Sequence, residues 1–117
     1  MLILTRQQEI AGVLENMIAL IETYGWVQGH MGSVDEGFCV VGALSFSCSS
    51  DYYTNYWLLD NVKMEINKTL RNYPEFCSRS SWLQVWNDSL RTTKEEVLFV
   101  LEQTLKEIQC SIRTTSK

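Results

Sequence analysis

The sequence predicts an all-α protein: a single compact, irregular bundle of about four main helices, with a glycine-rich loop after the first helix. Three long segments repeat apolar residues at three- and four-residue spacing, and capping residues or helix breakers stand at their ends. A chain of 117 residues with 45% hydrophobic side chains is sufficient for one core. We therefore predict one domain over residues 1–117, with residues 113–117 as a frayed tail because they have nothing to bury.

The first helix is predicted over residues 5–24. Thr5 and Gln8 have the spacing of a capping box at its start. Gly25 can adopt the left-handed conformation that ends a helix. The apolar stripe between them consists of Ile10, Val13, Leu14, Met17, Ile18, Ile21 and Tyr24.

The next two segments carry weaker signals. Residues 26–37 contain three glycines, a serine and an aspartate, which predict an irregular loop rather than a regular element. The apolar run over residues 38–46 has no period, and its adjacent valines make a buried strand as plausible as a buried helix. We choose a helix because a lone strand in a helical protein has no partner for its backbone groups. Gly42 and Ala43 also give a small face for close helix packing.

The third helix is predicted over the stripe from Trp57 to Tyr73. Candidate capping residues at 49–51 precede it, and Pro74 follows it. After Pro74, a short apolar piece at residues 82–86 predicts a turn or two of helix behind a serine cap at Ser80 or Ser81.

The last helix is predicted to begin at a second capping box, formed by Thr93 and Glu96. The acidic residues in its first turn suit the positive end of the helix dipole. Its apolar stripe runs from Val97 to Ile112.

Charge and hydropathy disfavour several functions. Ten basic and fourteen acidic residues give a net charge of −4, so we expect no nucleic acid as a partner, and we interpret Lys63, Lys68 and Arg71 as a solvated face. The longest nearly uncharged stretch, residues 38–50, is about half of what a membrane span needs, so we expect no membrane attachment. The apolar start of the chain is too short for a signal peptide. We therefore expect a cytoplasmic protein, in a bacterial cytosol or that of an infected host.

The cysteines predict no metal site. Cys39, Cys48, Cys77 and Cys110 include no C-x-x-C pair, and His30 is the single histidine. A tetrahedral zinc site would need scattered ligands, whereas apolar neighbours favour small buried thiols. We expect no cofactor.

Four motifs stand in order along the chain: Gly25-Trp26-x-x-Gly29, Cys39-x-x-Gly42-Ala43-Leu44, Trp86-Asn87-Asp88 and Thr93-x-x-Glu96-Val97. Together they resemble a family of small bacterial and bacteriophage proteins classed as a domain of unknown function. The resemblance covers roughly residues 10–105 and implies a helical domain without an established activity or catalytic residue. The chain departs from the family pattern at Thr92, where an arginine is expected; Arg91 stands one place earlier.

The sharpest enzymatic hypothesis is a Cys-dependent hydrolase. Cys39 at a helix start would be the nucleophile, His30 the base and Asp88 the residue that orients it, with the helix N-terminus lowering the thiol pKa. The alternative is an inert thiol buried in an apolar run. We favour the alternative and predict that the protein is not an enzyme.

Two further hypotheses concern binding. Trp86, Asn87 and Asp88, with Trp26 as a second wall, suit a small planar ligand that is nucleotide- or metabolite-like. The alternative is that Asn87 and Asp88 form a turn while both tryptophans fill the core. The second hypothesis is a protein interface made of Tyr52, Tyr53, Tyr56 and Trp57, since only part of this cluster can face one core.

The leading functional prediction is a non-enzymatic protein-interaction module that binds a protein partner or itself. We add the hypothesis that it is phage- or mobile-element-associated. Small-ligand binding at the two tryptophans is the alternative, and a hydrolase is third.

Overall fold

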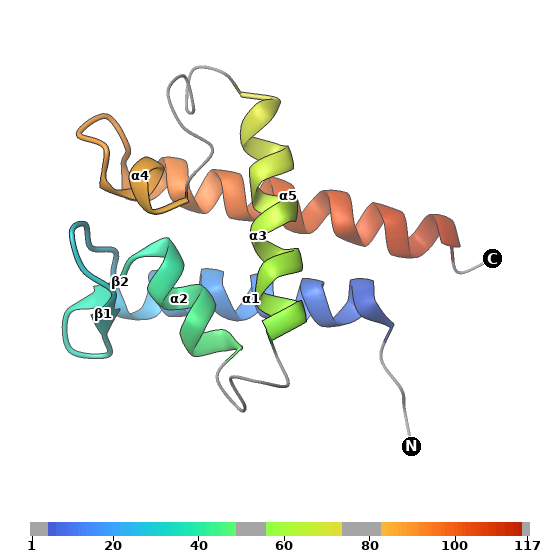
Figure 1. Ribbon diagram of the computed structural model, residues 1–117, viewed down its shortest axis with the longest axis horizontal. Coiled ribbons are helices and arrows are strands. Elements are labelled where there is room, and N and C mark those ends of the chain that lie inside the picture. Colours follow the sequence, from blue (N-terminus) through green and yellow to red (C-terminus); the bar gives the residue numbers. More distant parts are fainter. Residues whose placement is uncertain (1–4, 49–55, 74–82, 116–117) are drawn as a thin grey trace.

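The computed structural model of the protein describes residues 5–48, 56–73 and 83–115 (Figure 1). Within them the chain forms five helices and one two-stranded ladder, which confirms the predicted all-α class. The helices are α1 (Arg6–Tyr24), α2 (Val40–Ser47), α3 (Tyr56–Arg71), α4 (Leu83–Asp88) and α5 (Lys94–Thr115), and the strands are β1 (Gly32–Ser33) and β2 (Gly37–Phe38). None of these helices is long and apolar enough to cross a bilayer.

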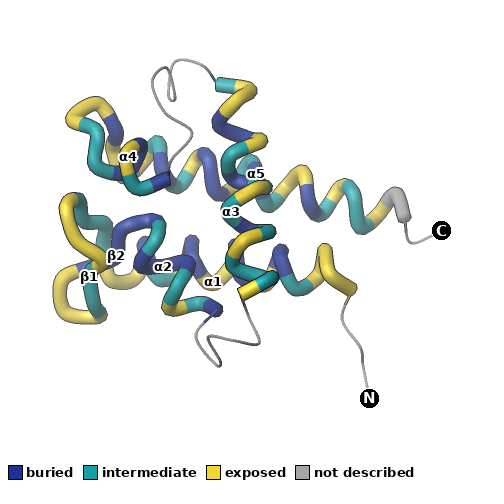
Figure 2. The backbone as a smooth tube through the Cα atoms, viewed as in Figure 1, coloured by how far each residue is buried: buried dark blue, intermediate teal, exposed yellow. Residues whose placement is uncertain are grey.

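The long helices α1 and α5 pack along each other and run in opposite directions, and α3 crosses both (Figure 1). The short helix α2 packs on α1, and α4 packs on α2. Figure 2 shows that buried and exposed residues alternate along α1 and α5, as the apolar stripes predict. The largest fully buried apolar side chains are Leu14, Met17, Ile21, Leu44, Ile66, Leu70 and Leu101.

Both ends of α1 lie where the sequence places them. The Gln8 N–H donates to Thr5 Oγ1 (3.2 Å), and the Thr5 N–H donates to Gln8 Oε1 (2.9 Å), so the predicted capping box is confirmed. Gly25 ends the helix with its N–H donating to the Ile21 carbonyl (2.9 Å). Its φ of 101° is positive, but its ψ of 176° is extended, so the predicted left-handed helical conformation is wrong in detail.

The predicted irregular loop contains a small hairpin. Gly32 pairs with Phe38 and Ser33 with Gly37 in antiparallel register. A Cβ at Gly32 would overlap the Gly37 carbonyl oxygen, and both glycines have positive φ. The two strands can therefore approach only because Gly32 lacks a side chain, whereas a Cβ at Gly37 would meet the backbone of Gly25 at the end of α1.

The apolar run at residues 38–46 forms both a strand residue and a helix. Phe38 belongs to β2, and its N–H donates to the Gly25 carbonyl (2.9 Å). Cys39 caps the following helix, because its Sγ accepts from the Gly42 N–H (3.1 Å). The choice of a helix is confirmed from Val40 onward and is wrong for Phe38.

The remaining boundaries differ by small amounts. The helix α4 ends at Asp88, two residues beyond the predicted piece. At the start of α5 the Glu96 N–H donates to Thr93 Oγ1 (3.1 Å), so one half of the predicted capping box is present. The Glu96 carboxylate accepts from the Trp86 indole N–H instead of completing the box. Residues 113–115 continue α5 rather than forming a tail. The capping residues proposed at 49–51 and 80–81, together with Pro74 and residues 116–117, lie outside the described residues.

Two buried threonines meet where α3 crosses α5. The hydroxyl oxygens of Thr69 and Thr104 are 2.7 Å apart, and Thr104 Oγ1 lies 2.8 Å from the Val100 carbonyl oxygen. Thr69 Oγ1 lies 3.3 Å from the Glu65 carbonyl oxygen. Each hydroxyl has one proton, which it can donate either to the other threonine or to the carbonyl one turn before it. The two hydroxyls therefore satisfy each other inside the core.

We expect Thr104→Val to lower the free energy of unfolding by about 1–2 kcal/mol, because it leaves the buried Thr69 hydroxyl without the Thr104 hydroxyl as its hydrogen-bond partner. Adding Thr69→Val to that variant is expected to cost less than Thr69→Val alone, with a coupling of about 1 kcal/mol. Urea unfolding of the wild type, both single variants and the double variant measures this coupling. Strict additivity would show that the two hydroxyls do not depend on each other.

Candidate functional site

The side chain of Asn87 joins three parts of the chain at one end of the molecule. It lies fully buried at the end of α4. Its Oδ1 accepts from the Trp26 indole N–H (2.7 Å) and from the Val40 N–H (2.9 Å). Its Nδ2 donates to the Val27 carbonyl (3.1 Å) and to Asp88 Oδ1 (3.0 Å). All four hydrogen-bonding positions of the amide are thus occupied. We call this set of five residues the Asn87 junction.

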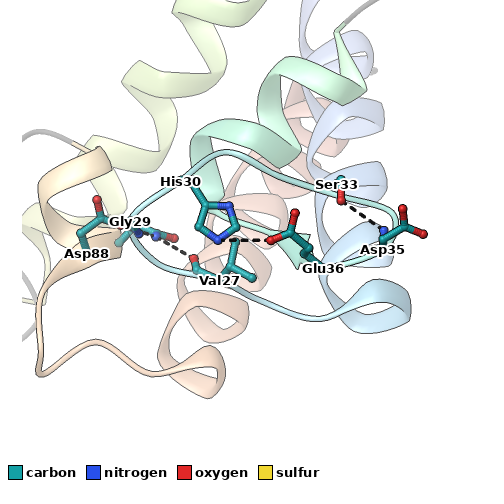
Figure 3. Close-up of polar contacts among 8 residues, drawn as sticks. Val27, Gly29, His30, Ser33, Asp35, Glu36 and Asp88 are labelled. Atoms are coloured by element: carbon teal, nitrogen blue, oxygen red, sulfur yellow. Dashed lines mark hydrogen bonds and ion pairs between the residues drawn. The ribbon is translucent and has the colours of Figure 1, made fainter.

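The Asp88 carboxylate fixes the hairpin loop to α4. Its Oδ1 accepts from the Gly29 N–H (2.9 Å, Figure 3), and its Oδ2 accepts from Gln84 Nε2 (2.7 Å). Burial raises the pKa of Asp88, but these hydrogen bonds, the Asn87 amide and nearby His30 outweigh burial, so the pKa lies below its usual value. Asp88 therefore stabilises the fold above its unfolded-state pKa, and this contribution is lost as pH falls through the folded-state value.

Two residues that sequence reasoning missed complete this end of the molecule. Gln28 Nε2 donates to the Asn87 carbonyl (2.9 Å) and to the Ser89 carbonyl (2.7 Å), which satisfies backbone acceptors at the end of α4. Gln84 lies one helical turn before Asp88 and holds it. Gln28 bonds to backbone carbonyls distant in sequence, so no spacing rule points to it. Only the i, i+4 relation of Gln84 to Asp88 was a usable signal.

Of the four residues proposed for a planar ligand, Trp26 bonds to Asn87, Asp88 bonds to the loop after α1, and Trp86 bonds to α5. Trp86 is buried, and its indole N–H donates to Glu96 Oε2 (2.8 Å). Trp26 is half-buried and donates to Asn87. The polar atoms of Asn87 bond within the chain, which favours a structural role over the ligand pocket.

The proposed Cys39–His30–Asp88 arrangement lacks an activated thiol. Burial raises the pKa of the Cys39 thiol, and the Asp88 charge raises it further. Hydrogen bonds from the backbone N–H groups at the start of α2 lower this pKa, but burial outweighs them, so the net lowering expected from the helix N-terminus is wrong. His30 is exposed, with its Nε2 3.7 Å from Glu36 Oε2 within the hairpin (Figure 3). In the described part of the chain, Cys39 Sγ accepts from the Gly42 N–H, and its thiol donates to Gln84 Oε1 (3.9 Å). The thiol is a helix cap.

The aromatic cluster at the start of α3 is described in part. Tyr56 is 60% exposed, whereas Trp57 is half-buried, with the Arg6 guanidinium carbon 4.8 Å from the centre of its ring. That arrangement is a cation–π contact between α3 and the first turn of α1. Tyr52 and Tyr53 lie outside the described residues, so the interface proposed there stays a prediction.

Exposed apolar side chains stand on the hairpin and on the turn between α4 and α5. Both segments lie at the same end of the molecule (Figures 1 and 2). Leu90 is 99% exposed, and Met31 and Val34 on the hairpin are 46% and 49% exposed. The Leu90 turn is held by the Thr92 N–H donating to the Ser89 carbonyl (3.1 Å) and the Arg91 N–H donating to Ser89 Oγ (3.3 Å). Three acidic side chains accompany these residues. We call the group the hairpin-end surface; it consists of Met31, Val34, Asp35, Glu36, Asp88 and Leu90.

The fold and the Asn87 junction define a small all-α domain whose short α4 is locked by a buried asparagine to the loop after α1. The chain belongs to a family of unknown function, DUF6197, whose model matches residues 5–107. Neither a curated protein nor a solved structure matches the chain. The match confirms that the chain contains a domain of unknown function, while the four motifs as its signature and a bacterial or phage origin stay predictions.

Proposed function

We propose that this protein is a non-enzymatic protein-interaction module and that its hairpin-end surface contacts the partner. The observation that carries the proposal is Leu90, which is 99% exposed on a hydrogen-bonded turn. A single exposed leucine is ordinary on a protein surface. Here Met31 and Val34 stand at the same end, and the Gly29–Asp88 bond ties their hairpin to α4. An ordered apolar group of this kind favours a protein contact.

The charges beside Leu90 indicate the chemistry of the partner. Asp35, Glu36 and Asp88 are acidic, whereas Arg91 is the basic residue next to Leu90 in the turn. A partner segment that carries lysine or arginine beside apolar side chains complements this surface. Two copies of the acidic surface repel each other, so charge favours a different protein over self-association.

The raised pKa of the Cys39 thiol and the occupied amide of Asn87 support the non-enzymatic part of the proposal. Neither group is poised for chemistry on a substrate. The resemblance to small bacterial and bacteriophage proteins extends the proposal to a phage- or mobile-element-associated role in a bacterial cytosol, with a host protein as the partner.

Selection of random 12-residue peptides on the wild-type protein tests the interface. We expect the selected peptides to be basic and apolar, and to bind the Leu90→Asp variant about tenfold more weakly or worse, because that change removes the central anchor. Their binding is expected to weaken as salt rises, since opposite charges meet across the surface. Tyr56→Asp serves as the comparison, because it places the same charge on an exposed side chain of the alternative interface on α3.

Three outcomes would overturn this assignment of the surface. Peptides that bind Leu90→Asp as well as the wild type would exclude Leu90 as an anchor. Loss of binding only in Tyr56→Asp would move the interface to the aromatic cluster of α3. A wild-type dimer that Leu90→Asp dissociates, seen by sedimentation, would make the partner a second copy of this chain.

A further inference from the structure

His30 lies among the acidic residues of the hairpin-end surface. Its Nε2 is 3.7 Å from Glu36 Oε2 of the hairpin, and in the view of Figure 3 the imidazole lies between Glu36 and Asp88. The Gly29 N–H donates to Asp88 Oδ1 (2.9 Å), which ties the residue before His30 to α4. The fold therefore holds the imidazole beside two of the three carboxylates of this surface.

The charge of His30 acts on Asp88 as well as on Glu36. Burial raises the pKa of Asp88, but hydrogen bonds from Gly29, Gln84 and Asn87, together with the positive charge of His30, lower it below its usual value. Histidine is the side chain whose charge ordinarily changes between pH 5 and 8. Asp88 stays ionised over that whole range, so a protonated His30 always has a carboxylate of α4 to attract.

The other ionisable groups on the surrounding segments keep their charge state near neutral pH. His30 is the single histidine of the chain. Asp35 lies in the hairpin turn, Arg91 in the α4–α5 turn and Glu22 in the last turn of α1, whereas α2 has no charged residue. Carboxylates and guanidinium groups ordinarily stay charged between pH 5 and 8. The Cys39 thiol stays neutral there, because burial raises its pKa.

We propose that protonation of His30 weakens the binding of a basic partner to the hairpin-end surface. The inference rests on the proposed function, because it concerns the same surface and the same partner. A protonated His30 pairs with Glu36 and compensates one of the three carboxylate charges of the surface. The surface then attracts lysine and arginine side chains less strongly, and the Glu36 carboxylate is engaged within the chain. Acidification thus releases the partner.

Peptide binding to the full chain at about pH 5.5 and about pH 7.5 tests this regulation. The probes are selected basic, apolar peptides without histidine or acidic residues and with both termini blocked, so that their own charge stays constant. We expect the wild type to bind them about two- to fivefold more weakly at the lower pH, and this difference to shrink as salt rises. His30→Gln is expected to bind equally at both pH values. His30→Arg is expected to bind at both as the wild type does at the lower one.

The side-chain amide of Gln84 gives a readout that needs no partner. Its Nε2 donates to Asp88 Oδ2 (2.7 Å) and is distant in sequence from His30. In ¹⁵N-labelled protein we expect this signal to shift with pH along the titration of the His30 imidazole, and to stay constant over the same range in His30→Gln. Thermal unfolding at both pH values confirms that every variant is folded.

The regulation and the proposed function fail in different ways. If Leu90→Asp weakens peptide binding but His30→Gln keeps the full pH dependence, His30 is not the sensor, while the interface stands. Binding by the wild type that is unchanged or tighter at the lower pH also overturns the regulation alone. If Leu90→Asp binds the peptides as tightly as the wild type, the interface itself is wrong and its regulation is overturned with it.

Discussion

Replacing Gly42 with alanine is expected to lower the free energy of unfolding by about 3 kcal/mol or more. A Cβ at Gly42 would overlap the Met31 carbonyl oxygen and lie 2.8 Å from its carbonyl carbon. Both are backbone atoms, so no side-chain rotation relieves the overlap. The same carbonyl accepts from the Cys39 N–H (3.2 Å) just before α2, so moving the helix away from the hairpin loop breaks that bond as well.

Gly12 provides the matched control for this substitution. It also lies inside a helix, but a Cβ added there meets no heavy atom within 4 Å. Gly12→Ala is therefore expected to stabilise the protein by about 1 kcal/mol, the difference in helix propensity between the two residues. Urea unfolding measures both variants. If Gly42→Ala proved as stable as Gly12→Ala, the close packing of α2 on the hairpin loop would be wrong.

The second large effect is expected for Asn87→Ala, at about 3 kcal/mol of lost stability. The change removes the buried Asn87 amide. The Trp26 indole N–H, the Val40 N–H and the Val27 carbonyl then lose the group to which they are hydrogen-bonded. An unpaired buried polar group costs far more than an average hydrogen bond contributes. The cost of the substitution therefore follows from the groups left behind rather than from the side chain removed.

Asn72→Ala serves as the control, because Asn72 is exposed and makes only a backbone bond to Thr69. Hydrogen exchange of the Trp26 indole proton gives a second readout, since it reports the broken bond even where the fold survives. We expect this proton to exchange faster in Asn87→Ala than in the wild type or in Asn72→Ala. A loss of less than about 1 kcal/mol with unchanged exchange would contradict the role given to the Asn87 junction.

Local patterns of apolar residues predicted most of the fold. The stripes of α1, α3 and α5 could be predicted because each repeats its burial every turn, so a short window contains the whole signal. The hairpin could not, because Phe38 pairs with Gly25 and Gly32 through backbone groups, which leave no periodic pattern of side chains in the sequence. The same non-local pairing explains why the helix prediction for the apolar run held for α2 but was wrong for Phe38.

The candidate site was predictable in its residues but not in its use. Trp86, Asn87 and Asp88 have side chains suited to hydrogen bonding, and Asn87 does accept from the Trp26 indole N–H. Their partners include the Val27 carbonyl and the Val40 N–H, which are backbone groups that any residue supplies. No sequence signal can therefore distinguish a ligand contact from an internal one.

The antiparallel arrangement of α1 and α5 has a practical result for immobilising the protein. The helix α1 starts, and α5 stops, at the end opposite the hairpin and α4 (Figure 1). A tether or fusion partner attached before Thr5 or after Thr115 is therefore anchored far from Leu90. Either attachment leaves the hairpin-end surface exposed to solution. The protein can therefore be immobilised through either end of the chain with the same surface accessible.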